Sequence, residues 1–149
     1  MAVSRAMRRL LRVLEMQEEQ TKAQMERALA DLRRLERALD AAGERERAGR
    51  QLVKTSAAEN EVTDRLAGVE ESRMAIRQSA ALKPRIAGAG AAVNERRREF
   101  LDKHIERRQA ETVIERAEAK ESTEARRRGQ RDSDDWFLGK SLREKINER

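Results

Sequence analysis

Cysteine is absent from this 149-residue chain, and histidine, proline and aromatic residues nearly so, with one His, one Pro, one Trp and two Phe. Without Cys there is no disulfide and no thiolate ligand, and one His cannot complete an imidazole metal site. Aromatic residues make up 2% of the chain and charged residues 42%, which leaves too little apolar material for a thick core. We therefore expect no metal and no cofactor.

Long apolar runs are also missing. No window approaches the ~18 apolar residues of a membrane span, and the basic, amphipathic start MAVSRAMRRLLRVLEMQEEQ lacks the apolar core of a signal peptide. The abundant residues are Ala, Glu, Arg, Leu and Lys, which favour helix, and β-branched residues are sparse. The composition predicts a soluble, cytoplasmic, all-α protein.

Apolar residues recur in heptads from Met7 to Ala42. One line of the heptad holds Leu11, Glu18, Met25, Leu32 and Leu39, and the other holds Met7, Leu14, Thr21, Ala28, Leu35 and Ala42. Spacings of three and four residues put both lines on one helix face, which predicts a coiled coil with a left-handed supercoil. The partner helix can belong to the same chain.

The register is predicted to break at Gly43 to Gly49. A second seam in a shifted phase consists of Val62, Leu66, Val69, Ile76 and Ala80, and a weaker third seam of Val93, Phe100, Leu101, Ile105, Ala110, Val113, Ile114 and Ala117. The weak third seam needs support from the first arm. The expected fold over 1–149 is a long antiparallel two-helix coiled-coil hairpin.

Two positions for the turn remain open. Pro84 lacks a backbone donor and disfavours helix at Lys83, and Gly88 and Gly90 follow, so the first choice is a turn at about 83–90. It gives a first arm at about 3–82, a second at about 91–131 and a tail at 132–149. The alternative turn lies at about 43–58, where Ser56 to Glu59 has the spacing of a capping box for a restarting helix.

Catalytic motifs are not evident. Gly88 to Gly90 superficially resembles a dinucleotide-binding loop, but that fingerprint needs a preceding strand. His104 has neither a nucleophile nor an orienting group at helical spacing, and the carboxylates alternate with Arg and Lys as on a solvated helix surface. We expect a protein that is not an enzyme.

Two basic clusters are candidate partner-binding residues: Arg5, Arg8, Arg9 and Arg12 at the start, and Arg126, Arg127, Arg128 and Arg131 near the end. An antiparallel hairpin would bring both clusters to one end. They are typical either of a solvated charged face or of a docking patch for an acidic protein surface. Nucleic acid or anionic lipid is a weaker alternative, because interleaved aromatics and specific motifs are missing.

The only aromatic cluster is Trp136 and Phe137, followed by Leu138. Two interpretations stay open for it. The cluster can pack back on the first arm, or it can anchor a partner, since aromatic side chains concentrate binding energy when they fill a pocket.

The C-terminal half resembles a known family. Glu95 to Glu99, ERRRE, and then RRQAETVIERAEAKESTEARRRGQRDSDDWF from Arg107 to Phe137, is similar to the second helix of the FliJ/YscO family, stalk proteins of flagellar and injectisome type III secretion. The start, Met7 to Leu14, MRRLLRVL, resembles the family's opening helix. The resemblance thus extends over most of the chain.

This resemblance implies an antiparallel coiled coil in the central pore of a hexameric secretion ATPase. The protein would stimulate the ATPase, contact the cytoplasmic domain of the export gate and assist substrate chaperones, at the cytoplasmic face of the inner-membrane apparatus. Membrane contact would be peripheral, through the complex, and nucleic acid is not an expected partner. Flagellar members carry aromatics near the turn that this chain lacks, so gate-contacting residues cannot be transferred, and the injectisome branch is favoured.

Overall fold

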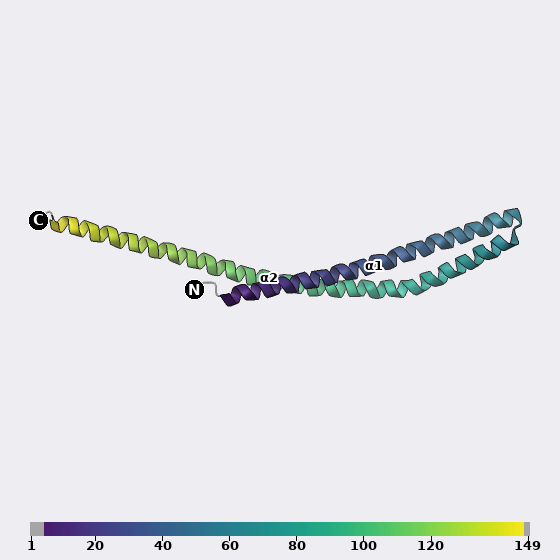
Figure 1. Ribbon diagram of the computed structural model, residues 1–149, viewed down its shortest axis with the longest axis horizontal. Coiled ribbons are helices and arrows are strands. Elements are labelled where there is room, and N and C mark those ends of the chain that lie inside the picture. The colour runs from purple at the N-terminus through teal and green to yellow at the C-terminus, as the bar shows by residue number, and fades with distance from the viewer. Residues whose placement is uncertain (1–4, 148–149) are drawn as a thin grey trace. The chain divides into compact units, whose positions relative to one another are not determined.

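The computed structural model describes residues 5–147 and consists of two helices, α1 (Arg5–Glu59) and α2 (Val62–Asn147), of 55 and 86 residues. The helices run antiparallel and are joined by a tight turn (Figure 1). The predicted all-α, two-helix coiled-coil hairpin is confirmed. Residues 3–4 of the predicted first arm and residues 148–149 of the predicted tail lie outside the described residues.

The turn lies at Asn60 and Glu61, so the first predicted position, 83–90, is wrong, and the alternative, about 43–58, ends two residues before the turn. Asn60 has a φ of 60°, the left-handed conformation that Asn adopts more readily than most residues. The amide of Glu61 donates to the carbonyl of Ser56 at 3.0 Å, which completes a Schellman motif that ends α1. The carbonyl of Glu61 then accepts from the amide of Arg65 at 3.3 Å, the first hydrogen bond of α2.

Pro84 lies inside α2 and does not break it. In the heptad of α2 it falls on the face opposite the seam, where it is exposed, as is Ala80 four residues earlier, whose carbonyl loses its donor. Water can therefore reach the freed carbonyl. Gly88 and Gly90 also continue the helix, and a Cβ at either would meet nothing within 4 Å.

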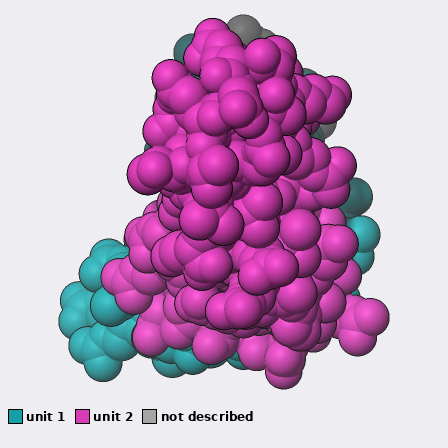
Figure 2. All heavy atoms as spheres, turned by 90° about the vertical axis from the view of Figure 1, so that its right-hand side faces the viewer, with its two compact units in different colours: residues 1–17, 103–149 teal, residues 18–102 magenta. Residues whose placement is uncertain are grey.

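The chain divides into two compact units, coloured separately in Figure 2. Unit 1 combines residues 1–17 with 103–149, and unit 2 consists of residues 18–102. Each unit therefore contains a stretch of α1 and a stretch of α2.

In unit 2 the heptad of α1 continues without a break. Ala42, Gly49 and Ser56 are its buried members near the turn, so the register break predicted at Gly43 to Gly49 is wrong. The sequence pattern looked broken because these positions hold small residues. Ser56 does not start a helix either, since its buried hydroxyl donates to the carbonyl of Val53 at 3.1 Å within α1.

The seam of α2 in unit 2 is also built from small residues near the turn. Its buried members are Gly68, Ala75, Leu82 and Val93, which are spaced as in one heptad. The second seam predicted from Val62, Leu66, Val69, Ile76 and Ala80 is wrong, because only Val69 is half-buried and the other four are exposed. These residues lie beside the seam instead of in it.

Gly49 and Gly68 mark a close approach of the two helices. A Cβ on Gly49 would lie 2.8 Å from the carbonyl oxygen of Gly68, and one on Gly68 would lie 2.7 Å from that of Gly49. The nearest atoms belong to backbone, which cannot move aside as a flexible side chain can. Glycine is therefore required at both positions by packing.

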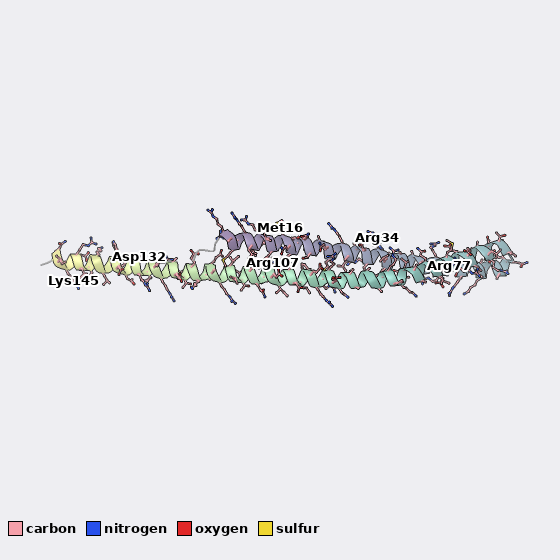
Figure 3. The ribbon with its side chains drawn as sticks, turned by 90° about the horizontal axis from the view of Figure 1, so that it is seen from below. Met16, Arg34, Arg77, Arg107, Asp132 and Lys145 are labelled. Atoms are coloured by element: carbon pink, nitrogen blue, oxygen red, sulfur yellow. The ribbon has the colours of Figure 1, made fainter. Side chains whose placement is uncertain are left out.

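In unit 1 the first turns of α1 lie along the middle of α2. Ile114 is buried, and Met7, Leu11, Leu14 and Ala110 are half-buried. The third predicted seam is confirmed only in part, since Val93 and Ile114 are buried while Leu101, Ile105 and Val113 are exposed. Figure 3 shows the side chains of Met16 and Arg107 on the two neighbouring helices of this unit.

Candidate partner-binding surfaces

The N-terminal arginine cluster lies on the first two turns of α1, and all four of its side chains are exposed. Arg8 forms an ion pair with Glu118 of α2 at 3.7 Å, between two side chains that are themselves more than half exposed. Arg5, Arg9 and Arg12 pair with no carboxylate among the described residues. Most of this cluster is therefore available to an acidic partner.

The C-terminal arginine cluster lies on α2, and Arg126, Arg127, Arg128 and Arg131 are all exposed. Consecutive residues of a helix point about 100° apart, so the first three arginines spread their guanidinium groups around the helix. Arg128 and Arg131, at a spacing of three, share a face. No described carboxylate forms an ion pair with any of the four.

Both arginine clusters belong to unit 1, although they do not face each other directly. Arg8 contacts Glu118, and Arg126 follows Glu118 by eight residues, or about 12 Å along the helix axis. The clusters thus succeed one another along α2. Together they form a basic stretch that starts where α1 begins and continues onto the part of α2 beyond it.

Beyond this point α2 continues as a single helix. Every residue from Ala125 to Asn147 is exposed except Gly139, which is half-buried. Figure 3 shows side chains projecting above and below the helix around Asp132 and Lys145. A polar helix without tertiary packing is marginally stable in water, so this stretch is suited to being completed by a partner.

The predicted aromatic anchor is on this single helix. Trp136 and Phe137 are 57% and 61% exposed, which contradicts the interpretation that they pack back on the first arm. Their rings meet edge to face with centroids 5.0 Å apart, and the Lys140 ammonium lies 5.5 Å from the Trp136 centroid. The aromatic pair is partly preorganised by these contacts.

An apolar stripe accompanies the aromatic pair and was missed as a unit in the sequence. Leu138, Leu142 and Ile146 recur every fourth residue, so they share one face of α2, and all three are exposed. The spacing was a usable signal.

Unit 1 also contains an apolar groove of about 420 Å³ between its two helix stretches. Its apolar lining comes from Met7, Leu10 and Leu14 of α1 and Ala110, Val113 and Ile114 of α2. Most of these residues belong to the predicted seams.

Interhelical electrostatics in unit 2 center on Arg45. Its guanidinium donates to Glu71 at 2.7 Å and to Gln78 at 3.1 Å, so it ties α1 to two turns of α2. The hydrogen bond from Arg45 to Glu71, with the attraction between the two charges, lowers the pKa of the Glu71 carboxyl below its usual value. At the turn, a hydrogen bond with Asp64 raises the pKa of the Glu61 carboxyl.

The chemistry of the remaining candidates is limited. His104 is half-buried on α2, and Gly88 to Gly90 lie in the helix interior, where no phosphate-binding loop can form. Within residues 5–147 no three His, Cys, Asp or Glu side chains gather where they could hold a metal ion. Neither described helix contains a stretch long and apolar enough to cross a membrane.

Comparison with known proteins gives no match to a family model, a curated protein or a solved structure.

Proposed function

We propose that this chain is a non-enzymatic stalk of a type III secretion apparatus, flagellar or injectisome, which binds and stimulates the export ATPase and links it to the export gate. The observation that carries the proposal is the single-helix stretch of α2 after Ala125, with arginines that pair with no described carboxylate and with the exposed Trp136 and Phe137. This stretch is built to be completed by a partner.

The resemblance to FliJ/YscO stalks supports the proposal. It rests on Met7 to Leu14, Glu95 to Glu99 and Arg107 to Phe137, and the first and last of these segments lie in unit 1. In such stalks the end that bears both termini faces the ATPase. The two arginine clusters of unit 1 are therefore the proposed contacts with the hexamer pore.

In this proposal the charged and the apolar side chains have different roles. Exposed arginines steer the helix toward acidic pore walls and fix its register there, while Trp136, Phe137 and the Leu138 stripe supply buried apolar area. Stimulation would come from binding an assembled hexamer better than free subunits, because any ligand that prefers one state shifts the population toward it. The chain itself would transfer no group.

The other partners follow from the same proposal. The cytoplasmic domain of the export gate and, as cargo adaptors, substrate chaperones would bind elsewhere on the hairpin. The protein would then be located in the cytoplasm, at the inner-membrane secretion complex.

The test is ATP turnover by the hexameric secretion ATPase of the same organism, measured as the protein is titrated in. We expect saturable stimulation by the wild type and at least a tenfold weaker half-saturation for Arg126→Glu/Arg127→Glu/Arg128→Glu, because three charges change sign at the interface. The control is Arg33→Glu/Arg34→Glu/Arg37→Glu, an equal charge change at exposed positions of α1. It should stimulate as the wild type does.

The alternative is a basic coiled coil that binds nucleic acid or anionic membrane through charge alone. Its affinity would collapse as salt rises, and both triple variants would lose binding alike. Absence of stimulation and of hexamer binding at moderate salt, together with such salt-sensitive binding to DNA or anionic vesicles, would replace the stalk proposal.

A further inference from the structure

Near the turn, one flank of the hairpin in unit 2 carries an uncovered apolar strip. It consists of Val62, Leu66, Val69 and Ile76, here called the turn-flank strip. Val62, Leu66 and Ile76 are 60%, 65% and 48% exposed, and Val69 is half-buried. Spacings of three, four and seven residues align these side chains along one side of α2.

The strip is exposed because the neighbouring seam is too narrow to take it. Gly49 and Gly68 bring the helix backbones into contact, so the seam is filled by small residues and larger apolar side chains lie outside it. A groove of about 350 Å³ runs there between the helices, lined by Val53, Val69 and Ser72 together with basic side chains.

The opposite flank is closed by polar contacts. There Arg45 spans from α1 to Glu71 and Gln78 of α2. Leu52 and Met74 are also exposed on that side, but the Arg45 bridge crosses the space between the helices. No comparable interhelical hydrogen bond or ion pair crosses the flank with the strip among the described side chains.

The rim of the strip is basic. Lys54 and Arg73 line the groove and form no ion pair with any described carboxylate, while Arg50, also in the lining, pairs with Glu46 of its own helix. A second copy of this chain would place the same basic rims against each other in a two-fold contact, which is unfavourable. The charges instead match a partner with acidic residues beside its apolar ones.

We propose that the turn-flank strip docks one amphipathic helix of another protein, whose apolar face is flanked by Asp and Glu. The helix lies along the groove, packs its apolar residues on Leu66, Val69 and Ile76, and places its carboxylates near Lys54 and Arg73. The result is a local three-helix bundle. This inference does not depend on the secretion proposal, because it uses only unit 2.

The test is a yeast-display selection against the full chain. The library presents helical peptides with apolar residues at positions i, i+3, i+4 and i+7 and with flanking positions randomised among Glu, Gln and Lys. We expect the enriched peptides to carry Glu at the flanks. Leu66→Gln/Ile76→Gln should weaken their binding at least about tenfold, since burying one such apolar side chain changes the dissociation constant by about tenfold or more.

The matched control is Leu52→Gln/Met74→Gln, which removes exposed apolar side chains from the other flank and should leave binding within about twofold. Circular dichroism checks that both variants are folded. The proposal is overturned if no peptide prefers the wild type to the strip variant, or if the enriched flanks are Lys. It is also overturned if light scattering finds a wild-type dimer that the strip variant dissociates.

Discussion

At the residue scale, the two glycines of the close approach differ from the other glycines of the chain. The amide nitrogen of Ser72 would lie 2.9 Å from a Cβ on Gly49, in addition to the carbonyl oxygen of Gly68, whereas a Cβ on Gly43 would meet nothing within 4 Å. Gly43 and Gly49 both lie inside α1. Their intrinsic helix propensity is the same, so packing alone separates them.

This difference predicts opposite effects of one substitution. Gly43→Ala should stabilise the hairpin by about 0.5 to 1 kcal/mol, since Ala favours helix over Gly. Gly49→Ala should destabilise it by about 1 to 3 kcal/mol, because the added methyl forces the backbones apart. Urea unfolding followed by circular dichroism measures both. Equal stabilisation by the two substitutions would show that the helices do not approach closely at Gly49.

At the element scale, the pairing of α1 and α2 depends on a polar bridge on one flank. The Glu71 carboxyl has a lowered pKa because Arg45 donates to it and attracts its charge. A lowered pKa in the folded state stabilises the fold above the usual value of 4.5, and this stabilisation is lost as the pH falls through the lowered value. Glu61 acts in the opposite direction, because its raised pKa favours folding at acid pH.

The bridge predicts a pH-dependent effect of Glu71→Gln. The variant should unfold at a lower temperature than the wild type near pH 7, and the gap should narrow as the pH falls below 4.5 and close once the wild-type carboxyl is protonated. The change is modest because both side chains of the pair are exposed to solvent. Thermal unfolding over this pH range measures it. Glu70→Gln is the control, at an exposed neighbouring position whose carboxylate forms no ion pair with any described residue; a gap of the same size there would contradict a specific role of the bridge.

The sequence predicted the helices better than their connection. Heptads of Leu, Met and Ala from Met7 to Ala42 are a strong pattern, and they lie in the seam as predicted. Near the turn the seam is made of Gly, Ser and Ala, which give no strong hydrophobic pattern in the sequence. Val62 and Leu66 have the spacing of seam residues, but they lie on the exposed flank. The turn is made at Asn60, which is a weaker sequence signal for a turn than Pro84. Pro84 does not break α2, because it lies on the exposed face of the helix.

For the candidate sites, the sequence identified the residues but not their exposure. Charge runs and rare aromatics identified Arg126 to Arg128 and Trp136 without knowledge of the fold. Their exposure could not be predicted, because it depends on where α1 begins relative to α2, and that follows from the turn. A turn at Asn60 makes α1 the shorter helix, so the end of α2 in unit 1 has no α1 residues beside it.

At the scale of the whole molecule, the buried residues and the proposed partner-binding residues lie in different parts of the chain. Among residues 5–147, the buried residues of unit 2 are Ala42, Gly49, Ser56, Gly68, Ala75, Leu82 and Val93, and the one buried residue of unit 1 is Ile114. The stretch after Ala125 contributes no buried residue. Regions with few buried contacts unfold locally at low cost, which leaves them free to order on a partner.

This division predicts the result of deleting residues 125–149. The full chain should lose part of its helical signal gradually at low temperature, as the single-helix stretch melts, and then unfold cooperatively. The deletion should remove the gradual phase and leave the cooperative transition within about 3 °C, because few tertiary contacts are lost. The same variant should no longer stimulate the secretion ATPase. A large drop in the cooperative transition would mean that the end of α2 packs on the hairpin in solution, and its exposed arginines and aromatics would then stabilise the fold instead of binding a partner.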